Sequence, residues 1–213
     1  MEPLFRTLAE KVDPKHTALV VVDVQNDFCA GGGFFDNAGW DLSMIQAMAP
    51  RLDSFIPQAR EAGVTTVFVQ AIYDQPYLSP AWIEKRTKRS SRKGLCLSGT
   101  WGADFYVVKP QPEDVVVTKH RFSAFVGSNL DLVLRSKGIR TVLATGVATN
   151  VCVESTARDA CQLDYSVVLL EDCCATNNEQ AHIATLQNVE RYFGEVRSSE
   201  EVAAAWQGVL AAR

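Results

Sequence analysis

The stretch RTVLATGVATNVCVESTARDACQ, residues 140–162, changes character in its middle. Its first part is apolar and β-branched, which predicts a buried strand over 140–146. After the polar pair Thr149 and Asn150, the pattern becomes that of a helix over 150–162. A buried strand that passes directly into a helix is typical of α/β proteins. Cys152 lies at the junction of the two.

The rest of the chain repeats this alternation of apolar strands and helices. The alternation predicts a mainly parallel sheet that is covered on both faces, which is a three-layer α/β/α sandwich. The predicted strands cover 17–23, 64–72, 114–119, 140–146, 165–172 and 194–198. The predicted helices cover 41–62, 128–137, 150–162, 179–192 and 199–211.

Length and composition suit a single domain. The chain has 213 residues, 47% of them hydrophobic and 22% charged, so we expect residues 1–213 to form one domain with a sizeable core. The segment 73–113 is polar, rich in Pro, Gly and Ser, and too long for a simple connection. We expect it to be a lid or a subunit contact.

Charge and hydropathy exclude some partners. The net charge of -4 argues against binding along a nucleic-acid backbone. No apolar run approaches the ~18 residues that span a bilayer, and the charged N-terminus does not resemble a secretory signal. We therefore expect a cytoplasmic protein with no nucleic-acid or membrane partner. The basic cluster in EKRTKRSSRKG (84–94) is expected to be a solvated loop or a loop that attracts an anionic substrate.

Cysteine and histidine patterns give little support for a disulfide framework or a metal. The six cysteines are scattered, and no C-x-x-C occurs. The three histidines form neither H-E-x-x-H nor D-x-H. We expect no metal and no cofactor.

Three reactive side chains fall at the carboxyl ends of predicted strands. Asp23 closes the first strand, Lys119 closes the third, and Cys152 follows the fourth. Ligands of open parallel sheets bind at this edge, so we expect the three to share one crevice. Taken singly, each has an ordinary explanation: a packed cysteine, a capping aspartate and a surface lysine.

Together the three types can carry out nucleophilic catalysis. A carboxylate takes the proton of the thiol, and an ammonium holds the carboxylate and favours the developing anion. The start of a helix favours the thiolate. Oxyanion donors are expected from the N–H groups of Ala148 and Cys152 in the tight turn. A Cys-His pair with His120 is the rival, but His120 should point to the other face of its strand.

These residues lie in motifs that resemble a known family. ALVVVDVQNDF with Asp23, KHRFSAF with Lys119, and GVATNVCVESTARDA with Cys152 are similar to the isochorismatase-like cysteine hydrolases over about residues 16–198. The resemblance implies a six-stranded sheet of order 3-2-1-4-5-6 and a catalytic Asp23–Lys119–Cys152 triad. It also implies a non-proline cis peptide before Ala148, and a homo-oligomer, either a dimer or a tetramer.

Within the family, the cysteine argues against true isochorismatases, and QAIYDQPYLSP (70–80) lacks the Asp-x-His of nicotinamidases. The chain most resembles ureidoacrylate amidohydrolases, with DFCAGGGFFDNAGWDLS and LLEDCC equally similar to biuret hydrolases. The resemblance thus implies a hydrolase of small ureido or carbamoyl amides, including biuret, triuret or N-carbamoyl amino acids. Candidate substrate-binding residues are Asn26, Phe28, Trp101, Arg121 and Phe125. Arg121 or an arginine of 86–92 is expected to pair with a substrate carboxylate.

Two other interpretations remain at this point. The chain can be a catalytically silent module of the same fold that binds a ligand. A redox pair of Cys152 with Cys161 is the weakest alternative, because the two lie more than two helical turns apart.

Overall fold

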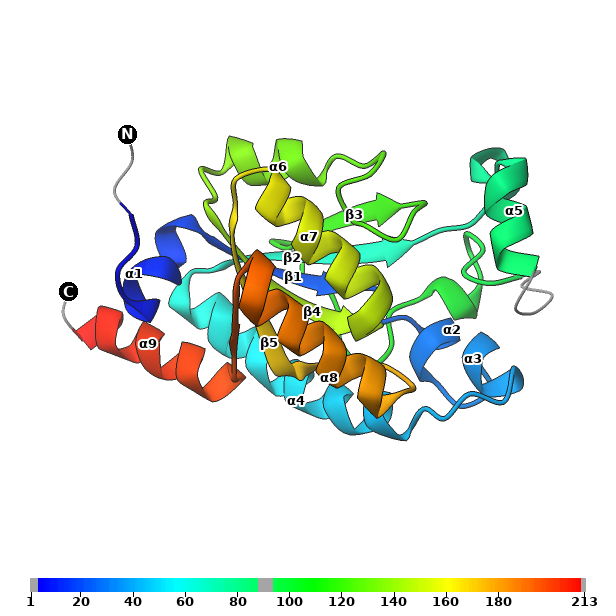
Figure 1. Cartoon of the computed structure of the whole chain (residues 1–213), viewed down its shortest axis with the longest axis horizontal. Helices are drawn as coiled ribbons and strands as arrows, with labels where there is room; N and C mark the ends of the chain where they lie inside the picture. The colour runs from blue at the N-terminus through cyan, green and yellow to red at the C-terminus, as the bar shows by residue number, and fades with distance from the viewer. Residues whose placement is uncertain (1–3, 88–93, 212–213) are drawn as a thin grey trace.

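The computed structural model describes residues 4–87 and 94–211. In this part of the chain, six parallel strands form one sheet in the order β3-β2-β1-β4-β5-β6, as the resemblance implies (Figure 1). The strands are β1 Thr17–Val22, β2 Thr65–Ala71, β3 Val115–Lys119, β4 Thr141–Val147, β5 Ser166–Ala175 and β6 Glu195–Arg197. The predicted strand boundaries lie within one residue of these, except at the end of β5. That strand continues three residues beyond its predicted end, through Cys173 and Cys174.

Helices cover both faces of the sheet, which confirms the three-layer sandwich. Besides the helices predicted from the sequence, the described residues form further helices of four to eight residues. The helices are α1 Leu8–Lys11, α2 Asn26–Cys29, α3 Phe34–Asn37, α4 Ser43–Ala62, α5 Pro80–Thr87, α6 Leu130–Ser136, α7 Glu154–Gln162, α8 Glu179–Asn188 and α9 Ser199–Ala211. Short helical turns cover Pro14–His16, Gln75–Tyr77, Trp101–Ala103, Thr149–Val153 and Val189–Phe193.

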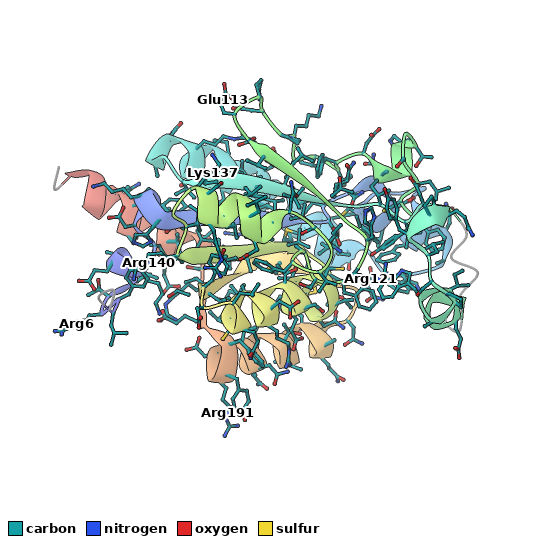
Figure 2. All side chains as sticks on the ribbon, turned by 90° about the horizontal axis from the view of Figure 1, so that it is seen from above. Arg6, Glu113, Arg121, Lys137, Arg140 and Arg191 are labelled. Carbon is teal, nitrogen blue, oxygen red and sulfur yellow. The ribbon has the colours of Figure 1, made fainter. Side chains whose placement is uncertain are left out.

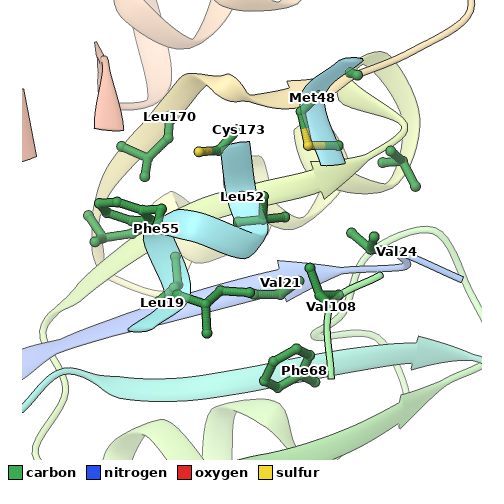
Figure 3. Close-up of a cluster of buried hydrophobic side chains, with 14 of the residues drawn as sticks. Leu19, Val21, Val24, Met48, Leu52, Phe55, Phe68, Val108, Leu170 and Cys173 are labelled. Carbon is green, nitrogen blue, oxygen red and sulfur yellow. The ribbon is translucent and has the colours of Figure 1, made fainter. Parts of the chain in front are cut away.

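Alternate residues of the central strand belong to two separate cores. Leu19 and Val21 of β1 pack toward α4, where Leu52 and Phe55 contact them in one cluster (Figure 3). Ala18, Val20 and Val22 of the same strand pack in the other cluster, with buried residues of α6 and α7. Every residue of β1 is buried, as expected for the middle strand of a sheet covered on both faces.

The pairing register aligns the carboxyl ends of the strands. Val22 at the end of β1 lies opposite Val69 of β2 and Gly146 of β4, and Ala71 at the end of β2 lies opposite Lys119. The strand arrows point toward α2, α3 and α5, which surround this edge (Figure 1). Residues that follow β1, β3 and β4 are therefore brought together there.

Within the described residues, no helix is long and apolar enough to span a bilayer.

Gly146 permits the close approach of β4 to β1. Its φ is 105°, and a Cβ there would lie 2.1 Å from the carbonyl oxygen of Val22. We expect Gly146→Ala to lower the free energy of unfolding by about 3 kcal/mol or more, because both backbone strain and the clash must be relieved. Urea unfolding measures this. Gly31→Ala is the control, because nothing lies near its Cβ, and it should change stability by under about 0.5 kcal/mol. Equal effects of the two would contradict the close-approach argument.

Candidate active site

Asp23 directly follows β1 and turns its side chain into the crevice at the end of the sheet. Its N–H donates to the carbonyl of Val69 at 3.0 Å, so the backbone still belongs to the ladder. Its φ is 52°, in the left-handed region that aspartate and asparagine tolerate better than most residues. The side chain is 1% exposed. A buried carboxylate requires a partner of opposite charge.

Lys119 at the end of β3 is that partner. Its Nζ lies 2.8 Å from Oδ2 of Asp23 and donates to Sγ of Cys152 at 3.4 Å. It also donates to the carbonyl of Arg121 at 2.7 Å. The side chain is fully buried, although lysine is almost never so unless paired. One ammonium therefore contacts both the carboxylate and the thiol, as the sequence predicts.

The burial of the group shifts its proton affinities. Burial raises the pKa of the Asp23 carboxyl, while the charge of Lys119 opposes this rise. Burial alone would lower the pKa of Lys119, but Asp23, Cys152 and Tyr73 together outweigh it and raise that pKa above its ordinary value. Burial raises the pKa of the Cys152 thiol to about 12, against the attraction of Lys119. The lysine thus stays charged and the cysteine rests as the thiol.

The start of a helix favours the thiolate, but here it does not outweigh the burial of the sulfur. Cys152 is 7% exposed and lies in a π-helical turn, Thr149–Val153, that precedes α7. The loss of solvation outweighs the favourable charges around the sulfur. The Asp23 carboxylate lies close enough to the thiol to affect its pKa, and it is therefore placed to take the proton.

The turn before the cysteine has the backbone that the resemblance implies. The peptide bond between Val147 and Ala148 is cis. The carbonyl of Ala148 accepts hydrogen bonds from Val151 N–H at 2.9 Å and Val153 N–H at 3.3 Å. The chain thus winds tightly around Ala148 and returns at Cys152, the two residues predicted to supply oxyanion donors.

His120 does not form a pair with the cysteine. Its Nδ1 hydrogen-bonds to the carbonyl of Ile72 at 2.8 Å, and its ring stacks on Tyr77 with centroids 3.5 Å apart. Because Lys119 takes the inward position of the strand, the next residue points away from it. The alternation argument therefore excludes the rival dyad.

Asn26 and Trp101, two candidate substrate contacts, lie together. Asn26 is buried at the start of α2, and its Nδ2 donates to the carbonyl of Trp101 at 2.8 Å. The indole of Trp101 is 54% exposed. Asn26 thus orients the backbone of residues 101–104 and leaves the tryptophan ring at the surface.

Phe28 and Phe125, two further candidate substrate contacts, both pack against other aromatic rings. Phe28 is buried and packs edge-on against Phe35, with centroids 5.0 Å apart. Phe125 packs on Tyr165, which precedes β5 at the opposite edge of the sheet from Cys152. The structure therefore does not bring Phe125 to the triad, because the chain after Lys119 has already turned back toward α6.

Arg121 links the end of β3 to α5. Its Nη1 donates to the carbonyls of Tyr77 at 3.0 Å and His120 at 2.7 Å. Its guanidinium lies over the ring of Trp82, 5.0 Å from the centroid. Figure 2 labels Arg121 on the side of the molecule that carries α5. Of the other proposed cations, Arg89 and Arg92 lie outside the described residues.

Sequence reasoning missed the aromatic residues around this edge. Tyr73 is buried, and its hydroxyl interacts electrostatically with Lys119, Cys152 and Asp23, while burial raises its pKa. The centroid of the Trp82 ring lies 6.3 Å from that of the Tyr73 ring and 4.7 Å from that of the Phe122 ring. Tyr73 directly follows the second predicted strand (64–72), which is the one signal in the sequence that would have identified it.

Gln25 is a second residue that the sequence did not single out. It is fully buried, and its amide bonds to Ala71 N–H, the Ala71 carbonyl and the Ala103 carbonyl at 2.8–3.0 Å. It therefore ties the segment 73–113 to the end of β2. Among the described residues, no three His, Cys, Asp or Glu side chains converge in a way that could hold a metal ion.

The fold and the site define a class of protein: a parallel α/β sandwich with a buried Asp–Lys–Cys group at the carboxyl edge of its sheet. The isochorismatase domain matches residues 17–201, and the chain belongs to the isochorismatase family. This confirms the resemblance drawn from the three motifs.

Relatives and solved structures refine this placement. The ureidoacrylate amidohydrolase RutB of Agrobacterium fabrum is 40% identical over 199 residues, covering 85% of this chain and 86% of that protein. The RutB of Stutzerimonas stutzeri is 41% identical over 211 residues, covering 92% and 83%. A cysteine hydrolase from Pseudomonas syringae pv. phaseolicola superposes with a TM-score of 0.82 at 25% identity, covering 97% and 98%. The N-carbamoylsarcosine amidase of Thermoplasma acidophilum superposes with a TM-score of 0.71 at 27% identity, covering 87% and 97%.

Proposed function

We propose that this protein is a cysteine-dependent amidohydrolase that cleaves the C–N bond of a small ureido or carbamoyl compound. The observation that carries the proposal is the position of Lys119, whose ammonium reaches both the Asp23 carboxylate and the Cys152 sulfur. The hydrolase class follows from the family, and the ureido substrate follows from the ureidoacrylate amidohydrolases that are about 40% identical.

In the first half of the reaction, Asp23 takes the proton of Cys152 as the sulfur attacks the carbonyl carbon. An S–C bond forms, and the carbonyl electron pair moves onto oxygen. The N–H groups of Ala148 and Cys152 stabilise this oxyanion. As the oxyanion collapses, the C–N bond breaks and Asp23 returns the proton to the leaving nitrogen. The product of this half is an acyl- or carbamoyl-enzyme thioester.

In the second half, water replaces the amine. Asp23 takes a proton from water, whose oxygen attacks the thioester carbon, and the C–S bond then breaks. The sulfur regains the proton, and the carboxylic or carbamic acid leaves. Lys119 remains charged throughout and holds Asp23 in place, because its pKa lies above its ordinary value.

Several small ureido and carbamoyl compounds are candidate substrates. Ureidoacrylate is the first candidate, because the relatives of highest identity described above carry that name. An N-carbamoyl amino acid is the second, because the N-carbamoylsarcosine amidase of T. acidophilum shares the fold over 97% of its length. Biuret and triuret remain further alternatives.

A screen of ammonia release over ureidoacrylate, N-carbamoyl amino acids, biuret, triuret and nicotinamide tests the proposal. Turnover of ureidoacrylate above the others supports it, and turnover of biuret alone changes the substrate but keeps the mechanism. If the protein binds these compounds without releasing ammonia, it is a ligand-binding module, and the proposal fails.

Arg121 gives a sharper test of substrate charge. The two hydrogen bonds of Nη1 leave Nε and Nη2 without a partner in the described part of the chain, so these two groups can donate to a substrate carboxylate. We expect Arg121→Gln to raise KM for an anionic ureido substrate about 10-fold or more and to leave KM for neutral biuret unchanged. Steady-state kinetics on both substrates measure this.

Lys137→Gln removes one positive charge on a different side of the molecule and is the matched control (Figure 2). Its KM for both substrates should equal that of the wild type. If Arg121→Gln raises KM equally for both substrates, the arginine has a structural role and does not pair with a carboxylate.

The proposal also covers the domain organisation and the oligomeric state of the protein. Residues 1–213 act as one domain. The segment 73–113 acts as a lid over the crevice or as a subunit contact, and the lid is favoured because Tyr73 and Trp82 from this segment lie near the triad. The active protein is a homo-oligomer that works without a cofactor. Sedimentation of the purified chain tests the oligomeric state.

A further inference from the structure

The turn that carries the nucleophile is tied to a helix that is distant in sequence. Thr149 is fully buried, and its Oγ1 lies 2.9 Å from Nδ1 of His182 on α8. His182 is also buried. The bond connects the residue directly after Ala148 to a side chain 33 positions further along the chain.

A second side chain of α8, one helical turn after His182, also makes a buried hydrogen bond. Oγ1 of Thr185 donates to Oε2 of Glu154 at 2.6 Å, and Glu154 is the first residue of α7. Residues three apart lie on one face of a helix, so His182 and Thr185 dock α8 together. The His182 contact reaches the turn before Cys152, whereas the Thr185 contact reaches the chain after it. The two bonds are therefore similar in burial but differ in what they position.

We propose that His182 is a positioning residue for the oxyanion donors: through Thr149 it fixes the orientation of the turn 148–152, and thereby the Ala148 and Cys152 N–H groups. This inference rests on the proposed hydrolysis at Cys152. Oxyanion donors act by being held in place before charge develops, so a small displacement weakens them. A bond from a buried imidazole to the first side chain of the turn supplies that restraint.

Removal of the hydroxyl in Thr149→Val leaves Nδ1 of His182 buried without its partner, and the turn relaxes to satisfy it. We expect kcat for the ureido substrate to fall about 10-fold while KM changes less than about twofold. The rate of alkylation of Cys152 by iodoacetamide, followed at its peptide by mass spectrometry, should change less than about twofold. Alkylation at a methylene carbon needs the nucleophile but creates no oxyanion.

Matched variants separate positioning from general stability. Thr185→Val removes the neighbouring bond of α8 and is expected to lower the melting temperature as much as Thr149→Val does, with kcat within about twofold of the wild type. Thr149→Ser and His182→Asn keep a polar atom at each end of the contact, and their kcat should stay within about threefold. His182→Phe keeps the ring volume without a nitrogen and should match Thr149→Val.

The proposal is overturned if Thr149→Val and His182→Phe retain wild-type kcat, or if alkylation slows as much as turnover. The second result would place the effect on the thiol itself. Failure of the proposed function is a different result, because Cys152→Ala would then keep turning over the substrate whatever the Thr149 variants do.

Discussion

Cys152→Ala is expected to lower turnover of a ureido substrate by about 10⁴-fold or more, the largest effect that any single change should produce. The thiol is the group that forms the covalent bond. Without it, only water could attack the substrate, and water is a much weaker nucleophile. Asp23 and Lys119 remain paired in this variant, because their contact at 2.8 Å does not involve the sulfur. Stability should therefore change by only about 1 kcal/mol, the net value of one hydrogen bond.

Initial rates of ammonia release, with unfolding curves on the same samples, measure both quantities. Cys161→Ala is the matched control, since Cys161 lies on α7 and is less buried than Cys152. It should keep wild-type turnover. Near wild-type turnover by Cys152→Ala would disprove the nucleophilic mechanism and would favour a direct attack by water.

Asp23→Asn and Lys119→Met are expected to remove activity and, in addition, to destabilise the fold. Each leaves one charge buried without its partner, which costs about 3–5 kcal/mol. Asparagine is the suitable replacement for Asp23 because it tolerates the φ of 52° at this position. Loss of the base or of the cation should lower kcat by about 10³-fold or more.

The double variant separates the two effects. With neither charge present, no buried ion is unpaired, so the double variant should be more stable than Lys119→Met alone and still inactive. Arg51→Met is the control for a surface pair, since Arg51 is 60% exposed and should contribute under about 1 kcal/mol. If the double variant is as unstable as the sum of the two single variants, the pair is not coupled in the way that the geometry indicates.

The sequence predicted the order of elements well because the pattern is local. Short runs rich in β-branched residues, such as TALVVV, favour a strand buried on both faces, and the structure places all six of these residues in β1. The short helices α2 and α3 were missed because four residues carry too little periodicity to recognise. Helix α5 was missed for a different reason, since it lies in a segment whose composition suggested an irregular loop.

The candidate triad was predictable because each member lies at the end of a strand or shortly after it, and parallel strands end at one edge. The supporting residues were not. Tyr73, Trp82 and His182 have sequence surroundings that fit ordinary packing, and each contacts a segment distant in sequence. Phe125 was predicted to line the pocket, but its ring packs on Tyr165, which precedes β5.

The sequence by itself determined the parallel sandwich, the three reactive residues and their order along the strands, because strand patterns and strand ends are properties of short segments. The tertiary structure decided the protonation of the group. Whether Cys152 rests as a thiol or a thiolate depends on how much water reaches the sulfur and how closely Asp23 and Lys119 approach it. Solvation and charge act through space, so they are fixed only when residues 23, 119 and 152 have been brought together.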